Sequence, residues 1–190
     1  MKSAAWVLVA FACVLLVSIG CSSSDDVINT PPPDRFVDNG DGTVTDNQTH
    51  LMWEKKTDDG SVHDVDNTYT WGTGFPNWET KNGTAFTTFL AGLNVGAGFA
   101  GHTDWRLPTS GGDTTSLTLD TAELESIVEL GHGAPTLNTI FGPTASYAYW
   151  SASTDSVYSY AAWRVEFDFG HVNGGPKDDA SYVRAVRGAS

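Results

Sequence analysis

Cysteine is nearly absent from this chain, which contains only Cys13 and Cys21 among its 190 residues. Cys13 lies inside an apolar N-terminal run, so Cys21 is the single thiol outside that run and the rest of the chain cannot form an internal disulfide. Without cross-links, an exported domain depends on its hydrophobic core for stability. The same scarcity excludes a catalytic cysteine in the body of the chain.

Basic side chains are also few, because 10 Lys and Arg residues face 23 Asp and Glu residues and the formal net charge is −13 at pH 7. Such a surface repels nucleic acid and sulfated polysaccharides within roughly 8 Å, the Debye length at physiological salt. We therefore expect no nucleic-acid partner, and the charge disfavours sulfated polyanions. Neutral ligands, cations, or solubility without any ligand are all consistent with it.

Compact motifs of catalysis and metal binding are missing as well. The sequence contains no GxSxG nucleophile motif and no HExxH motif. Carboxylate pairs are common in so acidic a chain and do not by themselves indicate a glycosidase. We expect no enzymatic activity, no cofactor and no metal site. None of the histidines has zinc-ligand spacing; they are His50, His63, His102, His132 and His171.

The first 20 residues have the pattern of a secretory signal. Lys2 precedes an apolar run over 4–19, which is short for a membrane-spanning helix. The stretch 17–21 resembles the lipobox of bacterial lipoproteins, with Ser18 where leucine is usual. This resemblance implies that Cys21 is acylated and anchors an exported protein to a membrane of the cell envelope, which would be the outer membrane if the cell is Gram-negative. The alternative is an ordinary signal peptide that ends near an incidental cysteine.

Residues 21–34 follow as a tether. They contain consecutive serines at 22–24 and consecutive prolines at 31–33, a composition that favours an extended segment over a packed one. No internal repeat and no second linker follow. We therefore divide the chain into a lipoprotein signal peptide at 1–20, an acylated Ser- and Pro-rich tether at 21–34 and one domain at 35–190.

The stretch 38–46, DNGDGTVTD, raises a choice between a calcium loop and a hairpin turn. An EF-hand loop needs oxygen ligands at its third and fifth positions and glutamate at its twelfth, but those positions hold Gly40, Gly42 and Thr49. Asn-Gly and Asp-Gly dipeptides tolerate the positive φ angles of tight turns. The spacing therefore predicts a hairpin turn between two short strands, with an irregular ion site shared with a distant loop as the alternative. These strands are expected at 35–37 and 43–45.

Two helices are predicted in the middle of the domain. Apolar side chains recur at helical spacing in 83–94, and again in 120–130 after a capping-box pattern. Both apolar stripes are expected to face the core. They comprise Phe86, Phe89, Leu90 and Leu93 in the first helix and Leu124, Ile127, Val128 and Leu130 in the second.

The last third of the chain is predicted to be β-structure. Trp163, Val165, Phe167 and Phe169 alternate with charged side chains, which predicts a strand with one buried face. A turn-rich loop at 170–179 and a closing strand at 182–187 are expected to follow. Strands at both ends with helices between them predict an α+β fold, with antiparallel sheets, two helices, and N- and C-terminal strands close together.

The segment 104–108, DWRLP, is interpreted as structural. Its alternation directs Trp105 and Leu107 to the core and places Asp104 and Arg106 on the opposite side, where we expect them to pair. Tryptophans in patterned segments are also expected to fill the core. They are Trp53, Trp105, Trp150 and Trp163.

Candidate ligand-binding residues come from loops. Trp71 and Trp78, in a Gly- and Pro-containing stretch, are candidates for stacking on the apolar face of a sugar, although core filling is the favoured interpretation of both. Two expected loops, at 153–160 and 171–179, flank the strand around Trp163, and loops on a rigid sheet commonly hold binding groups. These loops supply the remaining candidates Asp155, Tyr158, Tyr160, His171, Asn173 and Asp178.

Several segments, taken together and in order, resemble one bacterial family, the C-terminal domain of the Legionella collagen-like protein. They are 36–53, 101–109 (GHTDWRLPT), 123–124, 149–151 (YWS), 162–167 (AWRVEF) and 182–188 (YVRAVRG). The resemblance covers nearly all of 35–188 and implies a C-type-lectin-like fold. We assign structural roles to residues of these motifs, namely Asp104, Trp105, Arg106, Trp150, Trp163, Arg184 and Arg187.

The same resemblance implies a binding function. The adhesin module of this family is implicated in binding host or matrix polysaccharide, although the present chain lacks collagen-like repeats. Our leading hypothesis is an envelope-anchored lipoprotein whose non-enzymatic, lectin-like domain binds a neutral glycan or an envelope protein, with adhesion as one role. The alternatives are a structural or assembly component of the envelope and, least favoured, a hydrolase that uses scattered carboxylates.

Overall fold

The computed structural model describes residues 34–112, 122–131 and 133–188, which lie in one compact unit, Pro33–Ser190. The predicted signal peptide, Cys21 and the tether up to residue 33 lie outside the described residues. The strands are β1 (Phe36–Asp38), β2 (Thr43–Asp46), β3 (Leu51–Glu54), β4 (Tyr69–Thr70), β5 (Ala148–Thr154), β6 (Ala161–Glu166), β7 (His171–Pro176), β8 (Ala180–Ser181) and β9 (Val186–Gly188). The helical segments are a π-helix (Ala85–Leu90) continuous with α1 (Ala91–Asn94), α2 (Glu123–Ser126) and a 3-10 turn (Thr139–Phe141).

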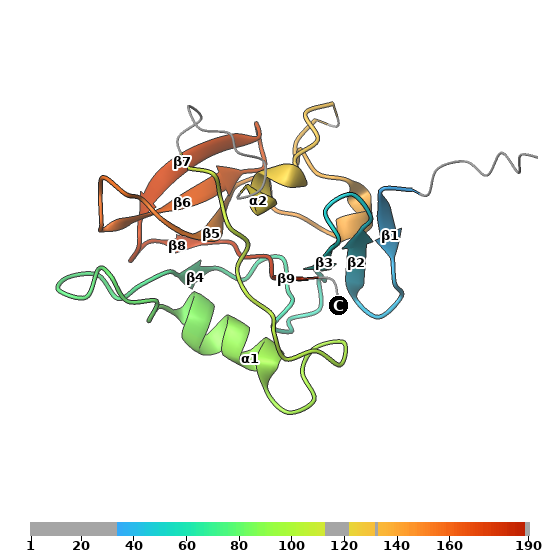
Figure 1. The fold of residues 1–190 in the computed structure, drawn as a ribbon, viewed down its shortest axis with the longest axis horizontal. Helices are drawn as coiled ribbons and strands as arrows, with labels where there is room; N and C mark the ends of the chain where they lie inside the picture. The colour runs from blue at the N-terminus through green and yellow to red at the C-terminus, as the bar shows by residue number, and fades with distance from the viewer. Residues whose placement is uncertain (1–33, 113–121, 132, 189–190) are drawn as a thin grey trace, which may run out of the picture. The chain divides into compact units, whose positions relative to one another are not determined.

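The strands pair antiparallel in small sheets (Figure 1). One sheet has the order β1-β2-β3-β9, another has the order β5-β6-β7, and β4 pairs with β8. Because β9 pairs with β3, with Val186 opposite Trp53, the first and last strands belong to one sheet. The predicted closeness of the N- and C-terminal strands is therefore confirmed. The fold is mostly antiparallel β-structure with few short helices.

The stretch 38–46 contains the predicted hairpin turn. β1 and β2 pair antiparallel across it, and Gly40 and Gly42 adopt φ angles of 77° and 88°. Asp41 Oδ1 accepts hydrogen bonds from the backbone N–H of Thr43 (3.1 Å) and from its hydroxyl (2.6 Å). Backbone geometry and side-chain hydrogen bonds within the loop thus fix the turn.

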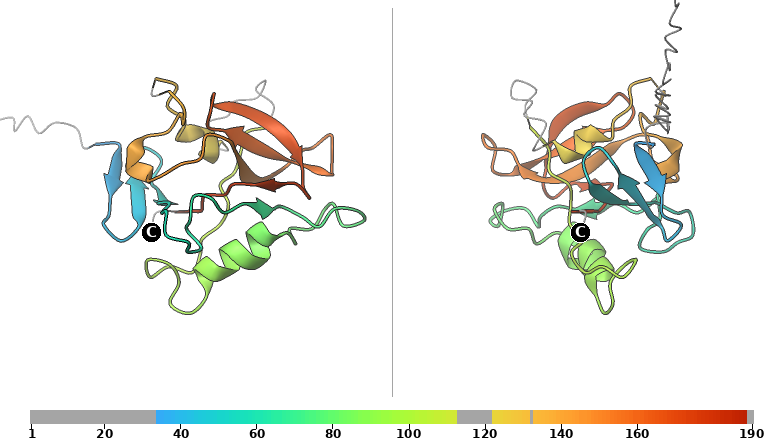
Figure 2. Two further views of the ribbon diagram at one scale, coloured as in Figure 1. Left: turned by 180° about the vertical axis from the view of Figure 1, so that it is seen from behind. Right: turned by 45° about the vertical axis from the view of Figure 1, so that its right-hand side comes forward.

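The first predicted helix is present but irregular. Its N-terminal part is a π-helix and its C-terminal part is α1, and it lies beside β4 (Figures 1 and 2). Phe89, Leu90 and Leu93 are buried, while Phe86 is half-buried with its ring 5.2 Å from the Trp71 ring. The predicted apolar stripe therefore packs into the core.

The second predicted helix, at 120–130, begins with two residues that lie outside the described part of the chain, and in the rest of it α2 covers only Glu123–Ser126. Leu124 and Ile127 are buried as predicted. Val128 instead forms a strand-like bridge with Leu137, and Leu130 is 73% exposed. The prediction of a buried stripe is therefore wrong at its end, since the chain leaves the helical path before that residue.

The C-terminal third departs from prediction in two ways. The segment 170–179, expected as a loop, contains β7, which pairs with the whole of β6. In the expected alternating strand, Val165 and Phe167 are buried, but Trp163 is half-buried and Phe169 is 65% exposed. Strand β6 ends before Phe169, which lies in the tight turn that leads to β7. The closing strand predicted at 182–187 is present only at its end, where β9 begins at Val186, and β8 lies just before the predicted range.

The DWRLP segment has different charge pairs from those predicted. Arg106 donates two hydrogen bonds to Glu123 (2.6 and 2.7 Å), and Asp104 accepts one from Arg187 Nε (2.7 Å). The prediction that Asp104 pairs with Arg106 is therefore wrong, because each finds a partner that is distant in sequence. Trp105 is buried as expected, and its indole N–H donates to a backbone carbonyl.

Two aromatic clusters form the core. Trp71, Trp105 and Trp150 belong to one cluster, and Trp53 and Phe141 belong to the other. The indole N–H of Trp150 donates to the carbonyl of Tyr69 (2.8 Å), so its polar group is satisfied inside the core. Of the tryptophans expected in the core, Trp163 alone lies outside these clusters.

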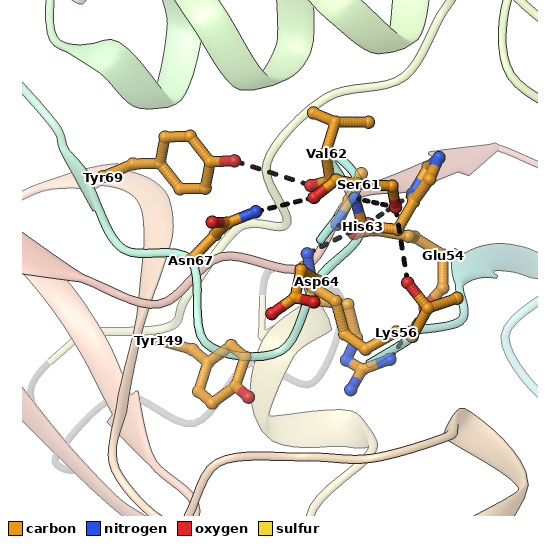
Figure 3. A network of polar contacts seen from close by, with 12 residues as sticks. Glu54, Lys56, Ser61, Val62, His63, Asp64, Asn67, Tyr69 and Tyr149 are labelled. Carbon is orange, nitrogen blue, oxygen red and sulfur yellow. Dashed lines mark hydrogen bonds and ion pairs between the residues drawn. The ribbon is translucent and has the colours of Figure 1, made fainter. Parts of the chain in front are cut away.

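A buried charged network accompanies the core (Figure 3). Glu54, at the end of β3, accepts hydrogen bonds from Lys56 Nζ (2.9 Å), His63 Nδ1 (2.8 Å) and the N–H of Ala185 (2.9 Å). Burial by itself raises the pKa of Glu54, but the Lys56 ammonium and these hydrogen bonds outweigh it and hold the pKa below its ordinary value. Arg184, also fully buried, donates to the carbonyl of Glu54 (2.8 Å). The network joins β3 to the chain that enters β9.

Candidate ligand-binding site

A pocket of about 330 Å³ opens where the loop between β5 and β6 meets the end of β7. Three of the residues predicted as ligand candidates, Asp155, Tyr158 and Tyr160, line it. Trp163 of β6 lines it as well, with its side chain half-buried. The remaining lining residues are Ala161, Gly174, Gly175 and Pro176.

The two carboxylate oxygens of Asp155 have different surroundings: one accepts hydrogen bonds from the backbone, and the other has no donor among the described residues. Its Oδ1 accepts hydrogen bonds from the N–H groups of Val157 (2.7 Å) and Tyr158 (3.0 Å), which fixes the start of the loop. Within the described part of the chain, its Oδ2 accepts no hydrogen bond. A Cβ placed on Gly174 would lie 3.3 Å from this Oδ2, so the glycine leaves the approach to the carboxylate open. The pocket therefore contains an acceptor for a hydroxyl or amide donor.

Aromatic rings line the pocket, and another lies beside it. The ring centroids of Tyr158 and Tyr160 are 5.7 Å apart, and Tyr160 lies 6.0 Å from the half-buried Trp78. Tyr158 and Tyr160 are 55% and 44% exposed, so their ring faces are accessible. Exposed aromatic faces beside a free acceptor are suited to binding a molecule that has both an apolar face and hydroxyl groups.

Lys177 fixes the two loops that carry these rings. Its side chain is fully buried, and its ammonium donates to the carbonyls of Trp78 (2.6 Å) and Ser159 (2.7 Å). The same ammonium lies 4.3 Å from the ring centroid of Trp71. Through its backbone N–H, Lys177 also donates to the carbonyl of Tyr160 (2.9 Å). One cation therefore holds the loop after β4 against the loop between β5 and β6.

Trp71 is a core residue. Its side chain is fully buried, and its indole N–H donates to the carbonyl of Ser151 (2.9 Å). The prediction that Trp71 is a sugar-stacking platform is therefore wrong, and the favoured interpretation of core filling is confirmed for it. Trp78, in the same stretch, is half-buried outside the pocket, with its ring 6.0 Å from that of Tyr160.

The candidates from the segment 171–179 do not gather at the pocket. His171 begins β7 at the end opposite to the pocket-lining glycines. Asn173 accepts a hydrogen bond from Arg164 Nε (3.2 Å) and donates one to Glu166, so it is engaged within the sheet. Asp178 is exposed beyond β7. The binding roles of these three residues stay predictions, without support from their placement.

Sequence reasoning missed Trp163, the glycines of β7, and Lys177. Its alternation with charged residues predicts a core position for Trp163, although the side chain is half-buried and lines the pocket. The Asn-Gly-Gly run at 173–175 was interpreted as a loop, although glycines within a strand also mark places where another group approaches the backbone closely. Nothing in the local sequence identifies Lys177 as buried, since its partners lie in two other loops.

A second cavity, of about 460 Å³, lies between the first helix and the DWRLP segment. Its lining is mostly apolar, with Phe86, Leu90 and Leu107 as the main side chains. Arg106 reaches it but is already paired with Glu123, so its charge is largely neutralised. The pocket beside Asp155, in contrast, combines a carboxylate with three aromatic side chains.

An acidic cluster lies in the loop after β3. One carboxylate oxygen from each of Asp58, Asp64 and Asp66 falls within 4.8 Å of the others. Asp64 already accepts hydrogen bonds from the N–H groups of Asp59, Gly60 and Asp66. These bonds, chiefly those from Asp66 and Gly60, lower the pKa of Asp64. The cluster is accounted for by the conformation of the loop.

A comparison with protein families finds one whose model matches this chain. The model described as the Lcl C-terminal domain matches residues 42–187, which include the pocket, one core cluster and all of the other except Phe36. A comparison with curated proteins gives no match. Among the residues that the structure describes, no helix has the length and apolar character needed to cross a membrane.

Proposed function

Because this chain belongs to the Lcl C-terminal domain family, we propose that it is the ligand-binding domain of an exported bacterial lipoprotein, and that the pocket beside Asp155 binds a neutral glycan. The main support for this proposal is that one pocket is lined by a carboxylate and three aromatic side chains, namely Asp155, Tyr158, Tyr160 and Trp163. We also propose a C-type-lectin-like fold. The common sheet of β1 and β9 and the short helices support it.

The chemistry of the pocket favours a neutral sugar. The C–H groups on one face of a pyranose ring are apolar and stack on aromatic rings, while its hydroxyls donate to a carboxylate oxygen such as Asp155 Oδ2. A net charge of −13 opposes the approach of sulfated or carboxylated chains. Binding requires none of these residues to act on a bond, and we propose a function without catalysis.

A glycan array tests this proposal with a charge-matched pair of variants. We expect the full chain to bind at least one neutral glycan, equally with calcium and with chelator. Asp155→Asn keeps Oδ1 for the loop but replaces the free oxygen by an NH₂ group, and we expect it to weaken binding about tenfold, or roughly 1.4 kcal/mol. Asp168→Asn, with the same charge change in the turn between β6 and β7, should bind like the parent.

A second pair of variants separates aromatic stacking from general surface effects. Tyr158→Ala should weaken the same glycan about tenfold, whereas Tyr147→Ala should not, although Tyr147 is 61% exposed. An array without any bound neutral glycan, or unchanged binding by both Asp155→Asn and Tyr158→Ala, would contradict the proposed function. Turnover of any bound polysaccharide would contradict the non-catalytic part of it.

A protein ligand is the second candidate, favoured by apolar exposure near the pocket. Phe75 is 81% exposed and Val157 is 76% exposed, a feature of protein interfaces as well as of glycan sites. This alternative corresponds to a structural or assembly role in the envelope. Photo-crosslinking from position 157 in intact cells would then give one discrete protein adduct, while the glycan array would show no binding.

We further propose that Cys21 is acylated and anchors the domain in the envelope. The segment 17–21 and the Ser- and Pro-rich tether support this proposal. Mass spectrometry of the protein from bacterial membranes should show a diacylglyceryl-modified N-terminal cysteine at position 21. Cys21→Ser should release the protein from the membrane fraction or leave it unprocessed. A free thiol at Cys21 in membrane-bound protein would contradict acylation.

A further inference from the structure

Aromatic side chains continue from the pocket across both loops held by Lys177. Beyond Tyr158, Tyr160 and Trp78, the ring of Phe75 lies 6.5 Å from that of Trp78. The loop after β4, which carries Trp78 and Phe75, and the loop between β5 and β6 project from the same side of the domain (Figures 1 and 2). We call these four side chains the aromatic row.

We propose that the aromatic row is a series of consecutive subsites, and that the ligand is a single linear, neutral glycan chain bound along several sugars. This inference rests on the function proposed above. Neighbouring ring centroids along the row are 5.7, 6.0 and 6.5 Å apart. One pyranose unit of a chain has a similar length, so successive sugars can each meet one ring. The first two sugars lie at Tyr158 and Tyr160 in the pocket beside Asp155, and Trp78 and Phe75 hold those that follow.

The exposure of the row is otherwise unexplained. Phe75 leaves 81% of its surface in water and Tyr158 leaves 55%, so neither contributes the stability that full burial of its ring would give. Contiguous exposed apolar surface on a soluble domain commonly marks a binding site. A sugar chain would cover these rings while its hydroxyl groups stay in contact with water.

The row is assembled before any ligand arrives. The Lys177 ammonium binds the carbonyl of Trp78 in one loop and that of Ser159, between Tyr158 and Tyr160, in the other. Because a buried cation with two acceptors resists displacement, the two halves of the row are fixed relative to each other. A preformed site reduces the conformational entropy that binding must overcome.

The orientation of the rings and the nearby charges restrict the ligand class. The planes of neighbouring rings are inclined by 48°, 66° and 61° along the row, so the rings do not form a flat platform. They suit a twisted single chain in solution and not the flat face of a crystalline polysaccharide. Glu79 follows Trp78 directly, and Asp178 lies close to Gly74 next to Phe75. These carboxylates disfavour an anionic chain.

Isothermal titration calorimetry with oligosaccharide ladders tests the inference. The full chain, purified in detergent, is titrated with cello-, N-acetylchito- and malto-oligosaccharides of one to six sugars. In at least one ladder we expect the affinity to rise about tenfold or more between two and five sugars, since the longer molecules reach Trp78 and Phe75. Binding of both short and long oligosaccharides should require Tyr158.

Variants at the far end of the row give the decisive comparison. Phe75→Ala and Trp78→Ala should remove most of the gain with length and leave binding of the disaccharide unchanged. Phe169→Ala, which removes another exposed ring outside the row, should leave the whole ladder unchanged. An affinity that does not rise with length, or a rise that survives both row variants, overturns this inference and leaves the pocket function intact. If no oligosaccharide of any of the three series binds, the proposed function is overturned as well.

Discussion

Replacing Glu54 by Gln is expected to lower the free energy of unfolding by about 3–5 kcal/mol, the usual cost of removing one partner from a buried ion pair. Lys56 and Glu54 are both buried, with 4% and 0% of their surfaces exposed. Once the carboxylate is gone, the Lys56 ammonium is left in the core without its counter-charge. Since a domain is stable by only about 5–15 kcal/mol, this loss is a large part of the total.

Hydrogen bonding adds to the charge effect. Glu54 is surrounded by donors, with Lys56 Nζ and His63 Nδ1 at one carboxylate oxygen and the N–H of Ala185 at the other (Figure 3). A glutamine amide has one oxygen and one NH₂ group, so in either orientation a donor faces a donor. Glutamine therefore keeps the shape of the side chain but cannot satisfy the network.

Urea unfolding of four proteins at pH 7 would measure this effect. Glu54→Gln is compared with the parent, with the exposed control Glu79→Gln, and with the double variant Glu54→Gln/Lys56→Met. The control carries the same charge change and should stay within about 0.5 kcal/mol of the parent. The double variant no longer contains the stranded ammonium and should be more stable than Glu54→Gln alone. A loss below about 1 kcal/mol in the single variant would contradict the buried-pair account.

The same network predicts a dependence of stability on pH. The folded-state pKa of Glu54 lies below its ordinary value of 4.5. Its contribution is therefore fully present above pH 4.5, where the unfolded chain is also ionised, and is lost as the pH falls from there through the folded-state pKa. Over this acidic range the parent should lose stability more steeply than Glu54→Gln, which has no carboxylate to protonate.

Local chemistry explains which parts of the fold could be predicted. The hairpin at 38–46 follows from dipeptides that select a turn, and the buried stripe of 83–94 follows from periodicity within one segment. Strand β7 could not be predicted in this way, because its Asn-Gly-Gly sequence is unfavourable in a strand and its conformation comes from pairing with β6. The partner of Asp104 is likewise set by tertiary contacts, since Arg187 belongs to the last strand.

The candidate site shows the same division. Asp155, Tyr158 and Tyr160 could be proposed because polar and aromatic residues in a loop between strands commonly bind ligands. The prediction of a core position for Trp163 is wrong. Alternation shows which side chains share a face of one strand, but it does not show that the neighbouring strand has a glycine beside the indole. A Cβ on Gly174 would lie 4.0 Å from the indole of Trp163, so the absence of a side chain there leaves space beside the ring. The role of Lys177 depends on three segments that only the fold brings together.

Replacing Gly42 by Val is expected to destabilise the domain by about 2–4 kcal/mol. Gly42 has a φ angle of 88°, a conformation that costs an L-residue about 1–2 kcal/mol and a β-branched residue more. A Cβ at this position would also lie 3.1 Å from the ring of Phe99, which is tighter than normal contact. Further atoms on that Cβ would force the ring to shift, and overpacking typically adds about 1–3 kcal/mol.

Asp41→Asn provides the contrast that separates a turn from a calcium site. Asparagine retains the Oδ1 that accepts from the Thr43 N–H and hydroxyl, so its effect should be only a few tenths of a kcal/mol. Thermal melts of the parent and both variants, with calcium and with chelator, would show which substitution lowers the melting temperature more. We expect Gly42→Val to melt far below the other two proteins, and calcium to change none of them. If calcium raises the melting temperature of the parent but not that of Asp41→Asn, the loop binds the ion, because a ligand that binds only the folded state stabilises it.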